Sequence, residues 1–260
     1  GCAVRALETR AGRVAGVVTE HGPIACGAVV LAAGAWSALF LRHLGLELPQ
    51  LKVKASVQRT AMAPLITESA VGATRAAFGR RQDGGYTIAR SGAGTFDLTP
   101  AAFRHFRAFL PALKERWGEL KLRVGRSFVD ELITPASWRA DRPSPFERTR
   151  VLDPAPDHKL LDQVMRDAAE LFPQLQGLRP VERWAGMIDV TPDEIPVLGP
   201  APDMPGLLVA TGFSGHGFGI GPAAGYAMAQ LAVGERPIVD LHPFRFTRFA
   251  EQDITRFPGP

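Results

Sequence analysis

Short apolar runs separated by glycine-containing turns predict a series of strands in the first fifty residues. Residues 2–7 and 13–19 are rich in apolar and β-branched side chains, which favour extended backbone. Residues 28–34 form a continuous apolar run that ends in glycine, a pattern typical of a sheet strand covered on both faces. A short helix is expected from Trp36 to Leu44, where Gly45 ends it.

Beyond residue 50 the pattern changes to alternation of apolar and polar positions. Residues 53–60 and 86–90 alternate in this way, which predicts half-exposed antiparallel strands. After Thr99 the apolar spacing becomes three and four, which predicts a helix with one buried face and a kink at Pro111. That face is expected to carry Phe103, Phe106, Leu110, Leu113 and Trp117.

The last third of the chain combines a further helix with a glycine-rich turn. Asp157 is expected to cap a helix whose apolar positions recur at helical spacing up to Phe172. Residues 207–209 predict a strand, the turn at residues 210–222 has four glycines from Gly212 to Gly219, and a small-residue helical pattern follows. This order brings bare backbone and the free N–H groups of a helix start against a ligand, which suits phosphates and electron-rich rings.

Together these elements predict an α/β (α+β) protein with a discontinuous layout. Residues 1–50 and 181–240 are expected to form one sheet-and-helix domain. Residues 51–180 form an inserted antiparallel domain with helices, and residues 241–260 form a C-terminal tail.

Composition and charge exclude several classes of protein. The longest apolar run is far shorter than the ~20 residues of a membrane span, and no compact Lys/Arg run with interleaved aromatics indicates nucleic-acid binding. The two cysteines have no metal-ligand spacing and fit a reducing cytoplasm. The net charge is +4, but residues 51–150 carry 18 Lys/Arg against 9 Asp/Glu. This asymmetry is read as a solvated basic face, or as a preference for an acidic substrate or partner.

A second dense segment runs from Arg183 to Pro200. Its prolines at 192 and 196 fix a stiff, non-helical path. Asp193 is read either as ordering a turn through its own backbone or as part of a rigid path beside a flat cofactor.

Three segments in this order resemble the C-terminal part of the FAD-dependent amine oxidoreductases of the D-amino-acid oxidase, glycine oxidase and sarcosine oxidase family. They are Val-Val-Leu-Ala-Ala-Gly-Ala-Trp-Ser at 29–37, Trp-Ala-Gly…Thr-Pro-Asp…Pro-Val-Leu-Gly at 184–199, and Thr-Gly-Phe-Ser-Gly-His-Gly-Phe at 211–218. The resemblance implies a partial Rossmann-like FAD-binding domain with an inserted antiparallel-sheet substrate domain.

The resemblance also implies where FAD lies. Backbone N–H groups at the start of the last helix would face the negative charge that forms around flavin N1 and O2. The implied cofactor-binding residues are Val4, Ala32, Ala33, Gly34, Trp36, Arg183, Gly186, Asp193, Gly212, Ser214, Gly215, His216, Gly217, Phe218 and Gly219. His216 is also a candidate hydrogen-bond donor near the ring, and Arg59, Arg90 and Tyr86 are candidates for the substrate pocket.

Three departures from the family pattern shape the expectations. The Gly-x-Gly-x-x-Gly unit that binds the diphosphate is absent, so it is expected to precede residue 1, in a missing N-terminal segment or a companion subunit. Gly186 stands where sarcosine oxidases carry the cysteine that tethers flavin, which predicts non-covalent FAD. Ile188 stands where D-amino-acid and glycine oxidases carry the arginine that binds the substrate carboxylate.

The predicted function is oxidation of the C–N bond of an amino acid or secondary amine by hydride transfer to flavin. The expected location is cytoplasmic, with attachment to a membrane surface as the alternative. Two other functions stay open. In the first, the chain would be a catalytically silent module of a flavoprotein. In the second, it would oxidise the alcohol group of a 2-hydroxy acid.

Overall fold

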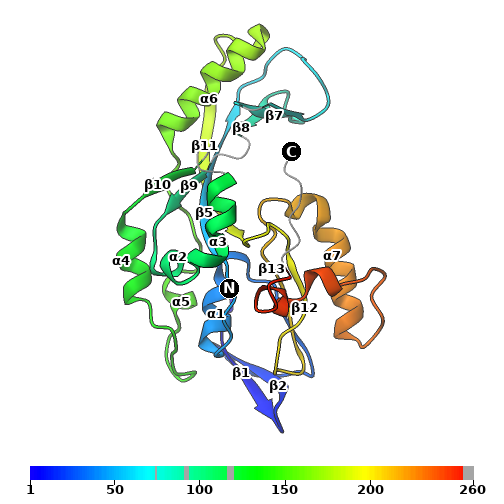
Figure 1. The fold of residues 1–260 in the computed structure, drawn as a ribbon. Coiled ribbons are helices and arrows are strands. Elements are labelled where there is room, and N and C mark those ends of the chain that lie inside the picture. The colour runs from blue at the N-terminus through cyan, green and yellow to red at the C-terminus, as the bar shows by residue number, and fades with distance from the viewer. Residues whose placement is uncertain (74, 91–93, 116–119, 254–260) are drawn as a thin grey trace.

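The computed structural model describes residues 1–73, 75–90, 94–115 and 120–253, and it contains three sheets (Figure 1). A small antiparallel sheet has the order β1-β2-β3, with β1 (Val4–Arg10), β2 (Arg13–Thr19) and β3 (Gly22–Ala25). A second has the order β12-β13-β4, with β12 (Val197–Pro200), β13 (Leu207–Thr211) and β4 (Val29–Leu31). Because β13 runs parallel to β4, this sheet joins the start of the chain to its last third.

The largest sheet has seven strands and is organised around β5 (Leu51–Thr60). β8 (Tyr86–Ala89) and β9 (Gly94–Asp97) pair with one side of β5, and β11 (Pro180–Val190) pairs with β5 from end to end. The sheet is completed by β10 (Leu120–Arg123), β7 (Ala77–Arg80) and β6 (Val71–Gly72). This mixture of helices and largely antiparallel sheets confirms the predicted fold class.

The helices connect and cover these sheets. They are α1 (Ser37–His43), α2 (Pro100–Arg104), α3 (Phe106–Glu115), α4 (Arg126–Ile133), α5 (Pro145–Arg148), α6 (His158–Leu171) and α7 (Gly217–Ala232). Short 3-10 turns are η1 (Gly34–Trp36), η2 (Pro173–Leu175), η3 (His242–Phe244) and η4 (Phe246–Phe249). The Asp157 carboxylate accepts a hydrogen bond from the Leu160 N–H, so the predicted cap of α6 is confirmed.

Strand register divides the seven-stranded sheet into two faces. Opposite residues of an antiparallel pair share a face, and successive residues alternate between faces. Gln58, Arg183 and Ile88 therefore share one face, which we call the α6 face because Ile88 packs against Val164 of that helix. The opposite face, the Gly186 face, carries Val53, Ala55, Val57, Trp184, Gly186 and Ile188.

The predicted aromatic stripe is wrong in two respects. The helix is interrupted at His105, whose carbonyl accepts the N–H groups of Ala108 and Phe109 and so begins a second helix, whereas Pro111 lies inside α3. Phe103 and Phe106 flank this interruption and are 64% and 50% exposed rather than buried. Trp117 lies outside the described residues.

The expected boundary near residue 181 falls at the start of β11, a strand of the large sheet. Residues 29–31 and 197–211 share one sheet, as a discontinuous domain requires. The division of the chain into domains stays a prediction.

An acid-sensitive contact ties β1 to α5. The Arg5 guanidinium donates two hydrogen bonds to Glu147, at 2.8 and 2.9 Å, and together with the Ser144 N–H it lowers the pKa of the Glu147 carboxyl to about 2. A lowered pKa gives stability that is complete above the unfolded value near 4.5 and is lost as the pH falls towards 2. We expect E147Q to flatten the acid limb of a stability–pH profile followed by urea unfolding. An unchanged slope between pH 4.5 and 2 would contradict this.

Candidate functional site

The glycine-rich turn between β13 and α7 holds three residues with left-handed backbone geometry. Gly212, Ser214 and Gly215 have φ angles of 76°, 51° and 88°. A Cβ on Gly212 would lie 2.5 Å from Thr191 Cγ2, so only glycine fits that position. The sequence therefore specifies a tight turn whose backbone directly contacts the end of β11 and the loop after it.

Two N–H groups at the start of α7 are available to a ligand. His216 is the N-cap residue, and its carbonyl accepts the N–H of Gly219 at 3.1 Å, so the N–H of Gly219, one of the predicted cofactor-binding residues, already has an acceptor. The N–H groups of Gly217 and Phe218 make no hydrogen bond within the described part of the chain. Such groups and the partial positive charge of the helix start attract negative charge. The side chains of His216 and Phe218 are exposed here.

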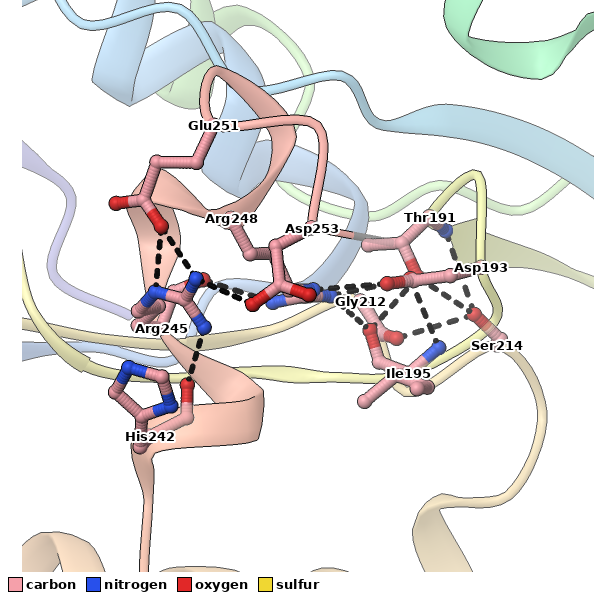
Figure 2. A network of polar contacts seen from close by, with 10 residues as sticks. All are labelled: Thr191, Asp193, Ile195, Gly212, Ser214, His242, Arg245, Arg248, Glu251 and Asp253. Atoms are coloured by element: carbon pink, nitrogen blue, oxygen red, sulfur yellow. Dashed lines mark hydrogen bonds and ion pairs between the residues drawn. The ribbon is translucent and has the colours of Figure 1, made fainter. Parts of the chain in front are cut away.

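Serine and threonine hydroxyls hold the turn against residues 191–195 (Figure 2). The Ser214 hydroxyl donates to the Gly212 carbonyl at 3.1 Å and accepts the Thr191 N–H at 3.4 Å. The Thr191 hydroxyl donates to the Ile195 carbonyl at 2.8 Å. The Thr-Pro-Asp loop and the glycine turn are thus one hydrogen-bonded unit.

The Asp193 side chain forms an ion pair with Arg248, a residue that no sequence motif indicated. Its carboxylate receives Arg248 Nε at 2.8 Å and Nη2 at 3.1 Å, and both side chains are almost completely buried (Figure 2). It also accepts the Ile195 N–H, which confirms the predicted turn through its own backbone. The Asp193 side chain therefore has a structural role, and any cofactor contact is left to its backbone.

The segment after β4 approaches α7 across a hollow of about 390 Å³. Its lining is apolar and small: Val30, Ala32, Gly34, Ala210, Phe213, Gly221, Ala224, Gly225, Met228 and Ala229. Ala33 is exposed beside it, and the Gly34 carbonyl accepts the Thr211 hydroxyl at 3.2 Å. The structure thus brings the predicted Ala32–Gly34 segment and the glycine turn together.

Trp36 and Val4 lie in other surroundings. The Trp36 ring packs edge-on against Phe146, with centroids 5.5 Å apart, and Lys52 Nζ lies 5.3 Å from the Trp36 ring. Burial lowers the pKa of the Lys52 ammonium, and Glu131 partly opposes this. Val4 packs against the core that contains Val14 and Leu31.

Tyr86, a candidate for the substrate pocket, and Arg183, a candidate for cofactor binding, belong to the α6 face of the sheet. Tyr86 is fully buried, and its hydroxyl donates to the Pro64 carbonyl and accepts the Ile66 N–H. Arg183 binds Gln58 and Asp162 of α6. Both side chains thus complete the packing beneath α6, and their roles at the substrate or cofactor stay predictions.

The remaining candidates for the substrate pocket are Arg59 and Arg90. Arg59 shares the Gly186 face but forms ion pairs with Glu182 and Asp83. Glu182 is six residues from Ile188, about 20 Å along the strand. Arg90 follows β8 and forms no ion pair with a described residue.

Near the turn, the Gly186 face presents Ile188 instead. Ile188 Cδ1 lies 3.7 Å from the position that a Gly215 Cβ would take. Gly186 is exposed, and a Cβ there would meet nothing within 4 Å. Sequence reasoning missed three residues that organise this region: Asp189, Thr191 and Arg248. The one signal for Asp189 was a charge at the end of a strand between two recognised motifs.

The residues present fit a flavin. The tight turn, the two free N–H groups and the apolar hollow offer backbone and small side chains to a flat, electron-rich ring. Gly217 and Phe218 would hold its anionic edge, and Gly34 and the Gly186 face would border it. No group of three or more His, Cys, Asp or Glu side chains among the described residues could hold a metal ion.

Flavin is expected to be bound without a covalent bond. Gly186 offers no side chain, and the free cysteines Cys2 and Cys26 flank the small β1–β3 sheet. Acid precipitation of the purified protein should therefore release all flavin into the supernatant, as measured by absorbance. Flavin fluorescence that stays with the precipitate would contradict this.

No helix in the described part of the chain combines the length and apolar character needed to cross a bilayer.

The chain is similar to known proteins in sequence and fold. The family model described as FAD dependent oxidoreductase (DAO) matches residues 1–231. A glycine oxidase from Pseudomonas aeruginosa is 32% identical over 234 residues, 89% of this chain and 49% of the relative. An N-methyl-L-tryptophan oxidase from Salmonella typhimurium is 37% identical over 100 residues, 36% of this chain and 27% of the relative.

Among solved structures, the L-amino acid deaminase from Proteus myxofaciens is 33% identical with a TM-score of 0.89, covering 95% of this chain and 55% of that one. The deaminase from Proteus vulgaris is 28% identical with a TM-score of 0.88, covering 95% and 57%. The chain spans about half the length of the relatives it matches. With the family model matching residues 1–231, the chain belongs to the DAO family of FAD-dependent oxidoreductases.

Proposed function

We propose that the protein oxidises the C–N bond of an amino acid or amine, using FAD. The observation that carries this proposal is the turn before α7, where the Gly217 and Phe218 N–H groups are unpaired among described residues. Small apolar side chains of α7 and of residues 30–34 line a hollow beside the same helix. When bound, FAD would accept the hydride of the substrate α-C–H bond. The substrate would leave as an imine, which water hydrolyses.

The chain's own residues would orient the substrate and stabilise the negative charge on the flavin. The two N–H groups of α7 would face the negative charge that reduction creates, in a fixed direction that costs no rearrangement. His216, at the N-cap with an exposed side chain, is retained as a candidate hydrogen-bond donor. The Gly186 face would line the other side of the substrate pocket.

The composition of the Gly186 face supports an apolar substrate side chain. Val53, Val57, Trp184 and Ile188 present no charge, and the carboxylate-binding arginine expected by resemblance is replaced by Ile188. Relatives include an N-methyl-L-tryptophan oxidase and a Proteus L-amino acid deaminase solved with anthranilate. We therefore place bulky apolar or aromatic amino acids ahead of glycine as substrates.

The test is an anaerobic substrate screen followed by loss of the visible flavin absorption. We expect bleaching by L-phenylalanine or N-methyl-L-tryptophan, and less with glycine or sarcosine. Bleaching by 2-hydroxy acids alone would favour alcohol oxidation. A purified protein with no flavin and no response to any amine would contradict the proposal.

A further inference from the structure

One carboxylate oxygen gathers three donors where β11 meets the glycine turn. Asp189 Oδ2 accepts the Gly212 N–H at 2.6 Å, the Thr211 hydroxyl at 3.0 Å and the Gln50 side-chain amide at 3.0 Å. The Asp189 carbonyl accepts the Ser214 N–H at 3.0 Å. A single residue of β11 therefore binds both the first and the third residue of the turn.

Its partners extend to the start of the chain. Gln50 is buried, and its side-chain oxygen accepts the Ala38 N–H of α1 at 3.0 Å. Thr211 is fully buried, and its hydroxyl also lies 3.2 Å from the Gly34 carbonyl. Asp189 thus joins two of the segments that carry the family resemblance directly, and Thr211 links them to Gly34 in the third.

The chemistry of the cluster calls for a carboxylate. The groups around Oδ2 are an N–H, an amide NH₂ and a hydroxyl, and a charged acceptor binds such donors about twice as strongly as a neutral one. With alanine in place of Asp189, the Gly212 N–H loses its acceptor. The turn would then be held to β11 chiefly through backbone and Ser214.

We infer that Asp189 is a positioning residue, which fixes the glycine turn so that the N–H groups of Gly217 and Phe218 keep their direction towards the flavin. This inference rests on the proposed function. It predicts that loss of the Asp189 side chain shifts the flavin's reduction potential in the direction opposite to the one expected from loss of charge alone. Removing a nearby negative charge makes reduction of a cofactor easier, whereas misdirecting the N–H groups that stabilise the reduced form makes it harder.

The first measurement is the midpoint potential of the flavin in the purified holoprotein. We expect D189A to shift the potential to more negative values, and D189N, which keeps an oxygen acceptor, to restore it towards the wild-type value. The matched control is E182Q, which removes a charge from the same strand where Glu182 pairs with Arg59. A positive shift in D189A, or no shift, would overturn the inference.

The second measurement needs no bound flavin. Hydrogen–deuterium exchange of the unliganded protein should be about tenfold faster over residues 212–218 in D189A, as expected for losing one charge-assisted hydrogen bond. Exchange over α6 should be unchanged. Equal exchange over residues 212–218 in wild type and D189A would overturn the inference. A protein that never binds flavin would instead defeat the proposed function and leave this measurement interpretable.

Discussion

Substitution of Arg248 by methionine is expected to lower the free energy of unfolding by about 3–5 kcal/mol, as breaking a buried ion pair does. The guanidinium bonds both oxygens of Asp193, the Ile195 carbonyl and the Arg245 carbonyl, and its side chain is 1% exposed. Methionine would fill much of the space but leave the Asp193 carboxylate buried without a counter-charge. Urea denaturation of the purified protein measures the effect.

Two further variants separate the buried charge from lost packing. R248M/D193N removes both charges and keeps an acceptor for the Ile195 N–H, so it should be more stable than R248M alone. R245M changes the neighbouring arginine, which pairs with exposed Glu251 and Asp253, and should cost under about 1 kcal/mol. Equal losses in R248M and R245M would contradict a special role for the buried pair.

The Arg248 contact also explains what periodicity could and could not predict. Strands, the α6 cap and the glycine turn follow from local patterns, because each depends on residues a few positions apart. Arg248 lies 55 residues from Asp193 and in a segment without helical or strand spacing. Nothing local distinguishes it from the partly exposed Arg245.

Strand register accounts for the positions of Tyr86 and Arg183 beneath α6. Alternation predicted β5 and β8 correctly, but it does not say which face of a strand meets the ligand, and β11 was expected only as a stiff, non-helical path. That choice is made by α6, which covers the face of Tyr86 and Arg183. Ile188 was noted in the sequence only because it stands where related oxidases carry an arginine, yet it is the residue that reaches the turn.

The same reasoning applies to the aromatic residues near His105. A spacing of three and four predicts one face of a continuous helix, whereas α2 ends after five residues. Phe103 and Phe106 then fall on two helices instead of one stripe. A hydrophobic pattern locates a core only where the helix that carries it is unbroken.

Substitution of Gly212 by alanine is expected to abolish flavin binding. A non-glycine residue at a φ of 76° costs about 1–2 kcal/mol. The added Cβ would in addition lie 2.5 Å from Thr191 Cγ2, so the turn or the Thr191 loop has to move. Either shift breaks the Gly212 N–H contact with Asp189 and redirects the start of α7. The ratio of flavin to protein absorbance after purification measures the loss.

Two controls divide this effect into its causes. Gly45 has a φ of 80° with nothing within 4 Å of an added Cβ, so G45A carries the backbone cost without the collision and should retain flavin. T191S removes the colliding methyl group while it keeps the hydroxyl that bonds Ile195, so G212A/T191S should recover part of the binding. If G212A retains full flavin content and an unaltered spectrum, the turn does not shape the cofactor site. If G212A/T191S binds no more flavin than G212A, the backbone angle rather than the contact with Thr191 makes glycine necessary at position 212.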